Sequence, residues 1–217
     1  MRTPSQSHYV QYGCGLDAPE GWLNFDASPT LRLQRLPLLG RWLRNRMDTR
    51  FPSNVRFGNI IFGLPVPPGS CQGVYCSHVL EHLALEDFRQ ALKQTFSLLR
   101  SEGIFRCVVP DLLHYAKVYV EAASQGDAHA GPEFVGRRTA LGRKTRPRRL
   151  RGLIHDYTRT TGHRWMWDRY SLGAELESAG FTGIRPCTPG DCEDPMFARV
   201  EKPGRFVNAV AMQCRKP

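Results

Sequence analysis

Three side chains in the stretch HDYTRTTGHRW have the types and spacing for acid–base chemistry, namely His155, Asp156 and His163. A neutral imidazole, whose pKa is normally about 6.5, can take a proton from a hydroxyl or an amine near neutral pH. The same histidines could instead hold a loop in place through hydrogen bonds, and the sequence favours neither interpretation. We therefore treat these three residues as candidate catalytic residues.

A second pair of this kind, Glu81 and His82, lies in the stretch LEHL. A carboxylate beside an imidazole resembles a catalytic pair, but a glutamate is also favourable near a helix N-terminus. The second interpretation is favoured, in which the two side chains orient the connection between a strand and a helix.

A glycine motif near the N-terminus indicates that the backbone approaches something closely. Gly13, Gly15 and Ala18 satisfy the dinucleotide pattern G-x-G-x-x-A. That pattern needs a helix N-terminus for the pyrophosphate, and too few residues precede the next strand for such a helix. Asp26 also lies 11 residues after Gly15, where a dinucleotide site expects an acid about 20 residues on. This spacing argues against an NAD(P)-dependent oxidoreductase.

The elements that must position these residues follow an α/β pattern, because short apolar runs alternate with helical periodicity. Residues 187–205 are expected to form a long loop before the last strand. We expect five strands followed by an antiparallel pair, in the stretches SHYVQYG, GWLNFDAS, SNVRFGNIIFGLP, GVYCSHVL, IFRCVVP, FTGIRPC and RFVNAVAMQC.

The clearest helix is predicted over 85–100, where apolar residues recur every three or four positions, with Gly103 as its stop. Further helices are predicted over 112–124 and in the stretch DRYSLGAELESAGF, where Gly180 is the stop. Residues 31–50 are basic and amphipathic, but proline and glycine interrupt them, so they form two short helices at best.

The composition is that of one globular domain of 217 residues, and 41% of these residues are hydrophobic. No apolar run is long enough to span a bilayer, and the start lacks the apolar core of a signal peptide. Seven cysteines occur without a C-x-x-C pair, which favours free buried thiols and gives no support for a metal site. We expect a soluble, cytoplasmic protein.

The formal net charge of +10 is concentrated in one segment, because eight of the fifteen residues in 137–151 are Arg or Lys. A solvated loop is the default interpretation of such a run. It could instead clamp an acidic small-molecule acceptor. Binding to nucleic acid or to an anionic membrane surface is less favoured, because few aromatic residues are interleaved with the charges.

The stretch YCSHVLEHLALEDFRQALKQTFSLLRSEGIFRCVVPDL, together with GCG, GWLNFD and GLPVP, resembles the class I S-adenosylmethionine-dependent methyltransferases. The likeness is strongest to a small bacterial branch in which a GW-N-D strand follows the glycine motif almost at once. It covers residues 8–112 well, and GHRWMWDRYSLGAELESAGF adds a second match. Each motif alone is moderately specific, but their order and spacing together are strong.

The resemblance implies a Rossmann-like α/β fold. Its sheet would have seven strands, mostly parallel with an antiparallel last strand, and helices on both faces. S-adenosylmethionine would bind beyond the carboxyl ends of the first strands, where open α/β sheets place their ligands. The backbone at Tyr12, Gly13, Cys14 and Gly15 would lie against the cofactor, and Asp26 would accept hydrogen bonds from both ribose hydroxyls.

Four further cofactor contacts are implied by the same resemblance. Asn59 would meet the adenine amino group, and Ile60 would pack on the ring. Ser77 and His78 would floor the methionine side. Because His78 would lie where the methyl group is presented, it is also a candidate catalytic residue.

The chain departs from the family pattern at Gln11 and Asn59, where acids are usual, and at Glu102, where a glycine is usual. We expect one methyltransferase domain over 1–217, with a substrate-cap or basic insertion at about 112–168. The expected reaction is methylation of a small-molecule or carbohydrate-type acceptor, with a mild preference for oxygen that rests on analogy. The alternative is a catalytically degenerate relative that binds nucleic acid or a partner through its basic segment.

Overall fold

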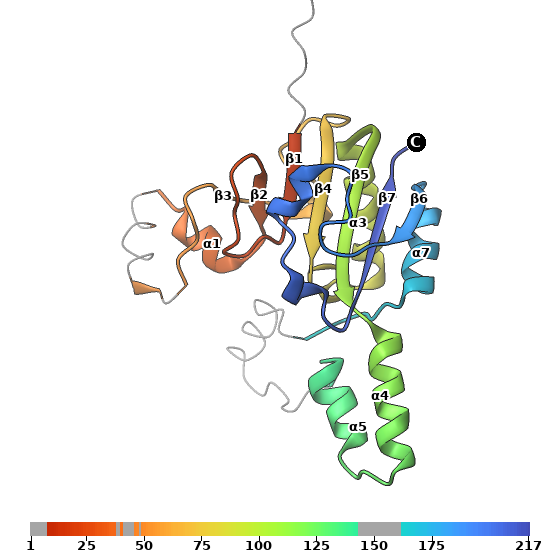
Figure 1. The fold of residues 1–217 in the computed structure, drawn as a ribbon. Helices are drawn as coiled ribbons and strands as arrows, with labels where there is room; N and C mark the ends of the chain where they lie inside the picture. Colours follow the sequence, from red (N-terminus) through yellow and green to blue (C-terminus); the bar gives the residue numbers. More distant parts are fainter. Residues whose placement is uncertain (1–7, 38–39, 41–45, 48, 143–161) are drawn as a thin grey trace, which may run out of the picture.

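A computed structural model describes residues 8–37, 40, 46–47, 49–142 and 162–217. These residues form one sheet with the strand order β3-β2-β1-β4-β5-β7-β6 (Figure 1). The strands are β1 (His8–Tyr12), β2 (Leu23–Asp26), β3 (Val55–Phe57), β4 (Cys71–Ser77), β5 (Leu99–Pro110), β6 (Thr182–Pro186) and β7 (Ala209–Arg215). β7 is antiparallel to both of its neighbours, while the other pairs are parallel. The expected fold is therefore confirmed.

Helices and short helical turns connect these strands. The α-helices are α1 (Pro29–Gln34), α3 (Leu85–Leu98), α4 (Leu112–Ser124), α5 (Ala130–Glu133) and α7 (Arg169–Ser178). The short turns are η1 (Ile60–Phe62), η2 (Leu80–His82), η4 (Pro195–Arg199) and η5 (Pro203–Phe206), together with the π-helical η3 (Phe134–Arg138). Within the part of the chain that the structure describes, none of the helices combines the length and apolar character that crossing a membrane requires.

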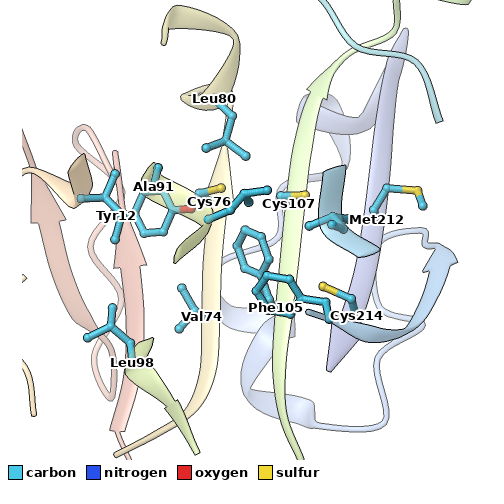
Figure 2. Packing of buried hydrophobic residues seen from close by; sticks show 14 of the residues in the cluster. Tyr12, Val74, Cys76, Leu80, Ala91, Leu98, Phe105, Cys107, Met212 and Cys214 are labelled. Atoms are coloured by element: carbon cyan, nitrogen blue, oxygen red, sulfur yellow. The ribbon is translucent and has the colours of Figure 1, made fainter. Parts of the chain in front are cut away.

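Two hydrophobic clusters cover the two faces of the sheet. On one face, buried side chains of α3 and α7 pack against alternate residues of the central strands, among them Val74, Phe105 and Cys107 (Figure 2). On the other face, Phe197 of η4 packs with residues such as Tyr75 and Ile104. The chain between β6 and β7 therefore covers this face of the sheet, as α3 and α7 cover the other face. The loop expected over 187–205 contains η4 and the start of η5.

Two local expectations are wrong in detail. The third strand stops at Phe57, and the apolar residues Ile60–Phe62 form the 3-10 turn η1 instead of extending it. Helix α3 ends at Leu98, and Gly103 lies within β5. A Cβ at Gly103 would lie 2.9 Å from the carbonyl oxygens of Arg100 and Cys71, so this glycine permits close backbone packing and does not stop a helix.

The sheet has its topological switch point beside β1. The chain passes from β1 to β2 and β3 on one side and then returns to β4 on the other. The carboxyl ends of β1, β2 and β4 therefore meet at one edge, where ligands of open α/β sheets bind. Helices α4 and α5 extend beyond this edge (Figure 1).

Candidate functional site

The strand register brings the predicted binding residues to one edge of the sheet. Tyr12, the last residue of β1, pairs with Phe25 in β2 and with Cys76 in β4. The glycine motif, Asp26 and the residues after β4 therefore begin at the same level. Residues far apart in the sequence line one site for this reason.

The two glycines of the motif have different structural roles. Gly13 has φ +66°, and a Cβ there would lie 2.1 Å from Cγ2 of Val79, so a side chain is excluded on both grounds. Gly15 has φ +57°, but no heavy atom lies within 4 Å of its ideal Cβ position. The backbone at Gly15 therefore faces open space. Between them, Cys14 is buried, and this burial raises the pKa of its thiol to about 12.

Asp26 is held by two backbone donors. Its Oδ2 accepts a hydrogen bond from the N–H of Gly15 at 2.9 Å, and its Oδ1 accepts one from the N–H of Ser28 at 2.8 Å. Each carboxylate oxygen keeps a second lone pair. A fixed, half-buried carboxylate beside the open backbone of Gly15 fits a ligand with two hydroxyl donors. The two acceptor oxygens of Asp26 therefore suit the two ribose hydroxyls of S-adenosylmethionine.

Asn24 and Gln11 are buried polar residues near this site to which the sequence analysis gave no binding role. The side-chain amide of Asn24 donates to the carbonyl oxygens of Pro19 at 3.1 Å and Trp22 at 3.0 Å, which holds the loop before β2. The asparagine of the GW-N-D pattern was the available signal for this support. Gln11, which stands where the family usually has an acid, is 5% exposed.

The residues predicted to meet adenine are engaged with the protein itself. Asn59 caps η1, because its Oδ1 accepts a hydrogen bond from the N–H of Ile61 at 3.0 Å. Ile60 is 4% exposed and belongs to the core cluster. Their roles toward adenine stay predictions.

Tyr12 and Ser77 lie at the ends of β1 and β4. The Tyr12 ring is buried, and its hydroxyl lies 3.2 Å from Oγ1 of Thr95 in α3, so its backbone is the part at the edge. The Ser77 hydroxyl is buried and has no hydrogen-bond partner among the described residues.

His78 follows β4 directly in a left-handed conformation, with φ +54°. Its Nε2 lies 2.8 Å from the carbonyl oxygen of Arg205, and its Nδ1 lies 3.4 Å from Oε1 of Glu81. Burial acts to lower the pKa of His78, but its ion-pair contact with Glu81 and its hydrogen bond to the Arg205 carbonyl outweigh burial and raise it. His78 is therefore a tethered side chain at the edge.

Glu81 and His82 connect η2 to the segment that precedes α7. The carbonyl oxygen of Glu81 accepts hydrogen bonds from the N–H groups of Arg164 at 2.8 Å and Trp165 at 3.2 Å. Nδ1 of His82 lies 3.2 Å from the carbonyl oxygen of Gly162. The expected structural role of this pair agrees with these contacts, although the contacts reach much further along the chain than the strand–helix connection.

His163 lies against the same group of side chains. Its ring centroid is 5.1 Å from that of His82, in an edge-to-face arrangement. Its Nδ1 is buried without a hydrogen-bond partner among the described residues, and burial lowers its pKa. The structure thus brings His163 and His78 together around Glu81. The other two candidates, His155 and Asp156, lie outside the described residues.

Comparison with known proteins also indicates a methyltransferase. Residues 15–185 match a protein family described as "Methyltransferase domain". No curated protein is similar enough in sequence to count as a match.

Several solved structures resemble the chain. A SAM-dependent methyltransferase from Archaeoglobus fulgidus has a TM-score of 0.51 and 16% identity, over 98% of this chain and 87% of that one. A possible histamine N-methyltransferase from Thermotoga maritima has a TM-score of 0.50 and 13% identity, over 98% and 83%. The CurJ carbon methyltransferase has a TM-score of 0.50 and 12% identity, over 98% and 49%. The chain thus spans about half of that structure, and 52% of PigF. At these identities the likeness concerns the fold.

Proposed function

We propose a reaction for this chain from the premise that it belongs to the methyltransferase domain family and is an S-adenosylmethionine-dependent methyltransferase. In the proposed reaction the methyl group moves to an oxygen atom of a small-molecule or carbohydrate-type acceptor. The observation that carries the proposal is the Asp26 carboxylate, which two backbone N–H groups hold beside the open backbone at Gly15.

The donor side of the site is assigned to β1 and β2. S-adenosylmethionine supplies an activated sulfonium methyl group, so the protein mainly aligns donor and acceptor, an effect that can be worth about 7–11 kcal/mol. Asp26 binds the ribose hydroxyls, and Gly13 and Gly15 let the backbone approach the cofactor. Asn59, Ile60, Ser77 and His78 complete the proposed cofactor site.

The acceptor side is assigned to the group of imidazoles after β4. A hydroxyl acceptor must lose a proton, and a positioned base typically contributes 10²–10⁴ in rate. His163 suits this task because burial lowers its pKa and so keeps its imidazole neutral near pH 7. This supports the preference for oxygen. His78 lies close by, and we keep His155 and Asp156 as candidates from the sequence.

An acidic acceptor agrees with where the basic run is attached. The run ends in the segment between Gly142 and Gly162, and the N–H of His163 donates to the carbonyl oxygen of Ala140 at 3.1 Å. The described residues that precede and follow residues 143–161 are therefore next to the proposed acceptor side. We propose that residues of about 112–168 form the substrate cap of a single domain.

A cytoplasmic location is part of the proposal. All seven cysteines are free, and six of them are buried. Free thiols are typical of a reducing compartment.

Calorimetric titration with S-adenosylhomocysteine tests the donor side. We expect saturable binding to the wild type and a loss of about 10- to 100-fold in Asp26→Asn, since hydrogen bonds to a charged group are worth about 1.5–3 kcal/mol. The matched control is Asp127→Asn. Asp127 holds the N–H of His129 at 2.8 Å, much as Asp26 holds that of Ser28, but it is exposed and follows α4.

Two results would overturn the proposal. A wild type that binds neither S-adenosylmethionine nor S-adenosylhomocysteine would favour the silent relative instead, and salt-dependent binding to RNA would strengthen that alternative. Equal affinities for Asp26→Asn and Asp127→Asn would remove Asp26 from the site.

A further inference from the structure

Three side chains at the acceptor side bring metal-ligating atoms together. Glu81, His82 and His163 each offer one such atom, and these three atoms lie within 4.8 Å of one another. The ligand atoms of one ion lie about 3–4 Å apart when each bond is about 2.0–2.2 Å long. Small side-chain rotations would therefore bring all three onto a single ion.

The Glu81 carboxylate is buried, and its nearest partners are imidazoles. Its side chain is 1% exposed, and neither of its oxygens has a hydrogen-bond partner among the described residues. The nearest imidazole nitrogens lie 3.4 Å away on His78 and 3.8 Å away on His82. A buried carboxylate is costly unless it is paired or binds a metal. A buried carboxylate grouped with imidazoles in this way is a candidate to bind a metal ion.

The two histidines are prepared to act as ligands. His82 faces the Gly162 carbonyl with Nδ1 at 3.2 Å, which assigns the proton to Nδ1 and leaves the lone pair on Nε2, the atom near Glu81. This is the arrangement that orients metal-bound histidines in proteins. Nδ1 of His163 is buried and has no hydrogen-bond partner among the residues that the structure describes.

We propose that Glu81, His82 and His163 bind one divalent transition-metal ion of the zinc type. Two imidazoles and one carboxylate are a donor set of catalytic zinc sites, which leave a further position open. Magnesium and calcium prefer oxygen ligands, so they fit this set poorly. His78 stands beside the same Glu81 oxygen as a fourth candidate ligand.

The open position would hold the acceptor hydroxyl, and this part of the inference rests on the proposed function. With the ion bound, His163 is a ligand and the cation replaces it in promoting loss of the hydroxyl proton. A bound cation lowers the pKa of a hydroxyl that it coordinates. The proton leaves to solvent water, and an electron pair of the oxygen forms the new bond to the methyl carbon. The bond between that carbon and sulfur breaks, and sulfur keeps its electrons, which yields S-adenosylhomocysteine. No oxidant or reductant is required.

Metal binding tests the site without any acceptor. Full-length protein without a histidine tag is stripped with a chelator and titrated with Zn²⁺ and with Co²⁺, whose visible absorption reports its coordination. We expect one equivalent in the wild type. Glu81→Gln and His163→Ala should each lose at least about 100-fold in affinity, since even supporting residues cost 10–100-fold. His129→Ala, at an exposed histidine, and Cys192→Ser, at the half-buried thiol, are the controls.

The outcome is decided by the wild type even where a variant fails to fold. A wild type without saturable binding overturns the inference, as do ligand variants that bind like the two controls. Titration with S-adenosylhomocysteine on the same samples separates the two proposals. Cofactor binding without metal binding sinks the metal site alone, whereas metal binding without cofactor binding sinks the proposed function alone.

Discussion

Arg106 and Glu201 form an ion pair inside the protein, with Nε and Oε1 2.7 Å apart and each side chain 1% exposed. Arg106 belongs to β5, while Glu201 follows η4 in the chain between β6 and β7. The pair therefore fastens the chain that covers this face of the sheet to one of its central strands.

Removing the charge of Glu201 should destabilise the fold. Breaking a buried pair leaves an uncompensated charge and typically costs about 3–5 kcal/mol, and we expect the lower end for Glu201→Gln because Asp191 also contacts Arg106. Urea unfolding measures the change. Glu175→Gln is the control, since its partner Arg89 lies at the surface and the loss should be much smaller. Equal losses of unfolding free energy in the two variants would show that the buried pair stabilises the fold no more than the surface pair does.

Gly15→Ala should separate ligand binding from stability. Gly126 has a similar positive φ, +78° against +57°, and neither glycine has a heavy atom within 4 Å of the ideal Cβ. Alanine in this conformation costs about 1–2 kcal/mol at either position. We expect similar losses of melting temperature in Gly15→Ala and Gly126→Ala. The affinity for S-adenosylhomocysteine should fall at least about tenfold in Gly15→Ala only. A Gly15→Ala variant with full affinity would mean that the cofactor does not approach this backbone.

Acid should weaken the fold through Asp191. Burial acts to raise the pKa of this carboxyl, but hydrogen bonds from the Thr188 N–H, Arg106 and Arg185 outweigh burial and hold its pKa well below its usual range. Because the unfolded pKa is about 3.9, the ionised carboxylate stabilises the protein above about pH 4. That stabilisation is lost as the pH falls through the lower folded-state pKa.

The variant Asp191→Asn checks this sign. In urea unfolding between pH 2 and 6, the gap in stability between wild type and variant should be widest at the upper end and narrow below about pH 4. Asp127→Asn controls for the loss of one negative charge at an exposed position. A gap that stays constant with pH would contradict the linkage.

The parts of the fold that the sequence predicted are those set by local patterns. Alternating apolar runs and the stripe on α3 were enough for the sheet and for its main helix, because burial on a known face leaves a periodic signal. The apolar residues of η1 carry no such signal, since a short apolar run fits a strand or a turn equally well. Gly103 was misread because its role depends on the backbone of Cys71, which only the folded sheet brings near.

The candidate site likewise has one part that the sequence predicts and one part that it does not. Gly15 and Asp26 lie 11 residues apart and their contact follows from two adjacent strands, so the spacing alone was informative. The group of Glu81, His82 and His163 joins positions about 80 residues apart. The sequence alone favours a structural role for Glu81 and His82, makes His163 a separate candidate and indicates no metal site. Only tertiary structure shows that these side chains meet.

The reactivity of the buried cysteines also reports when the core of the protein unfolds. Cys71, Cys76, Cys107 and Cys214 lie on three adjacent strands and pack into the main core, where Figure 2 shows the last three. Burial raises the pKa of these thiols, so the reactive thiolate is scarce in the folded state. A thiol reagent would therefore react with the half-buried Cys192 early and with the core thiols only as the strands separate.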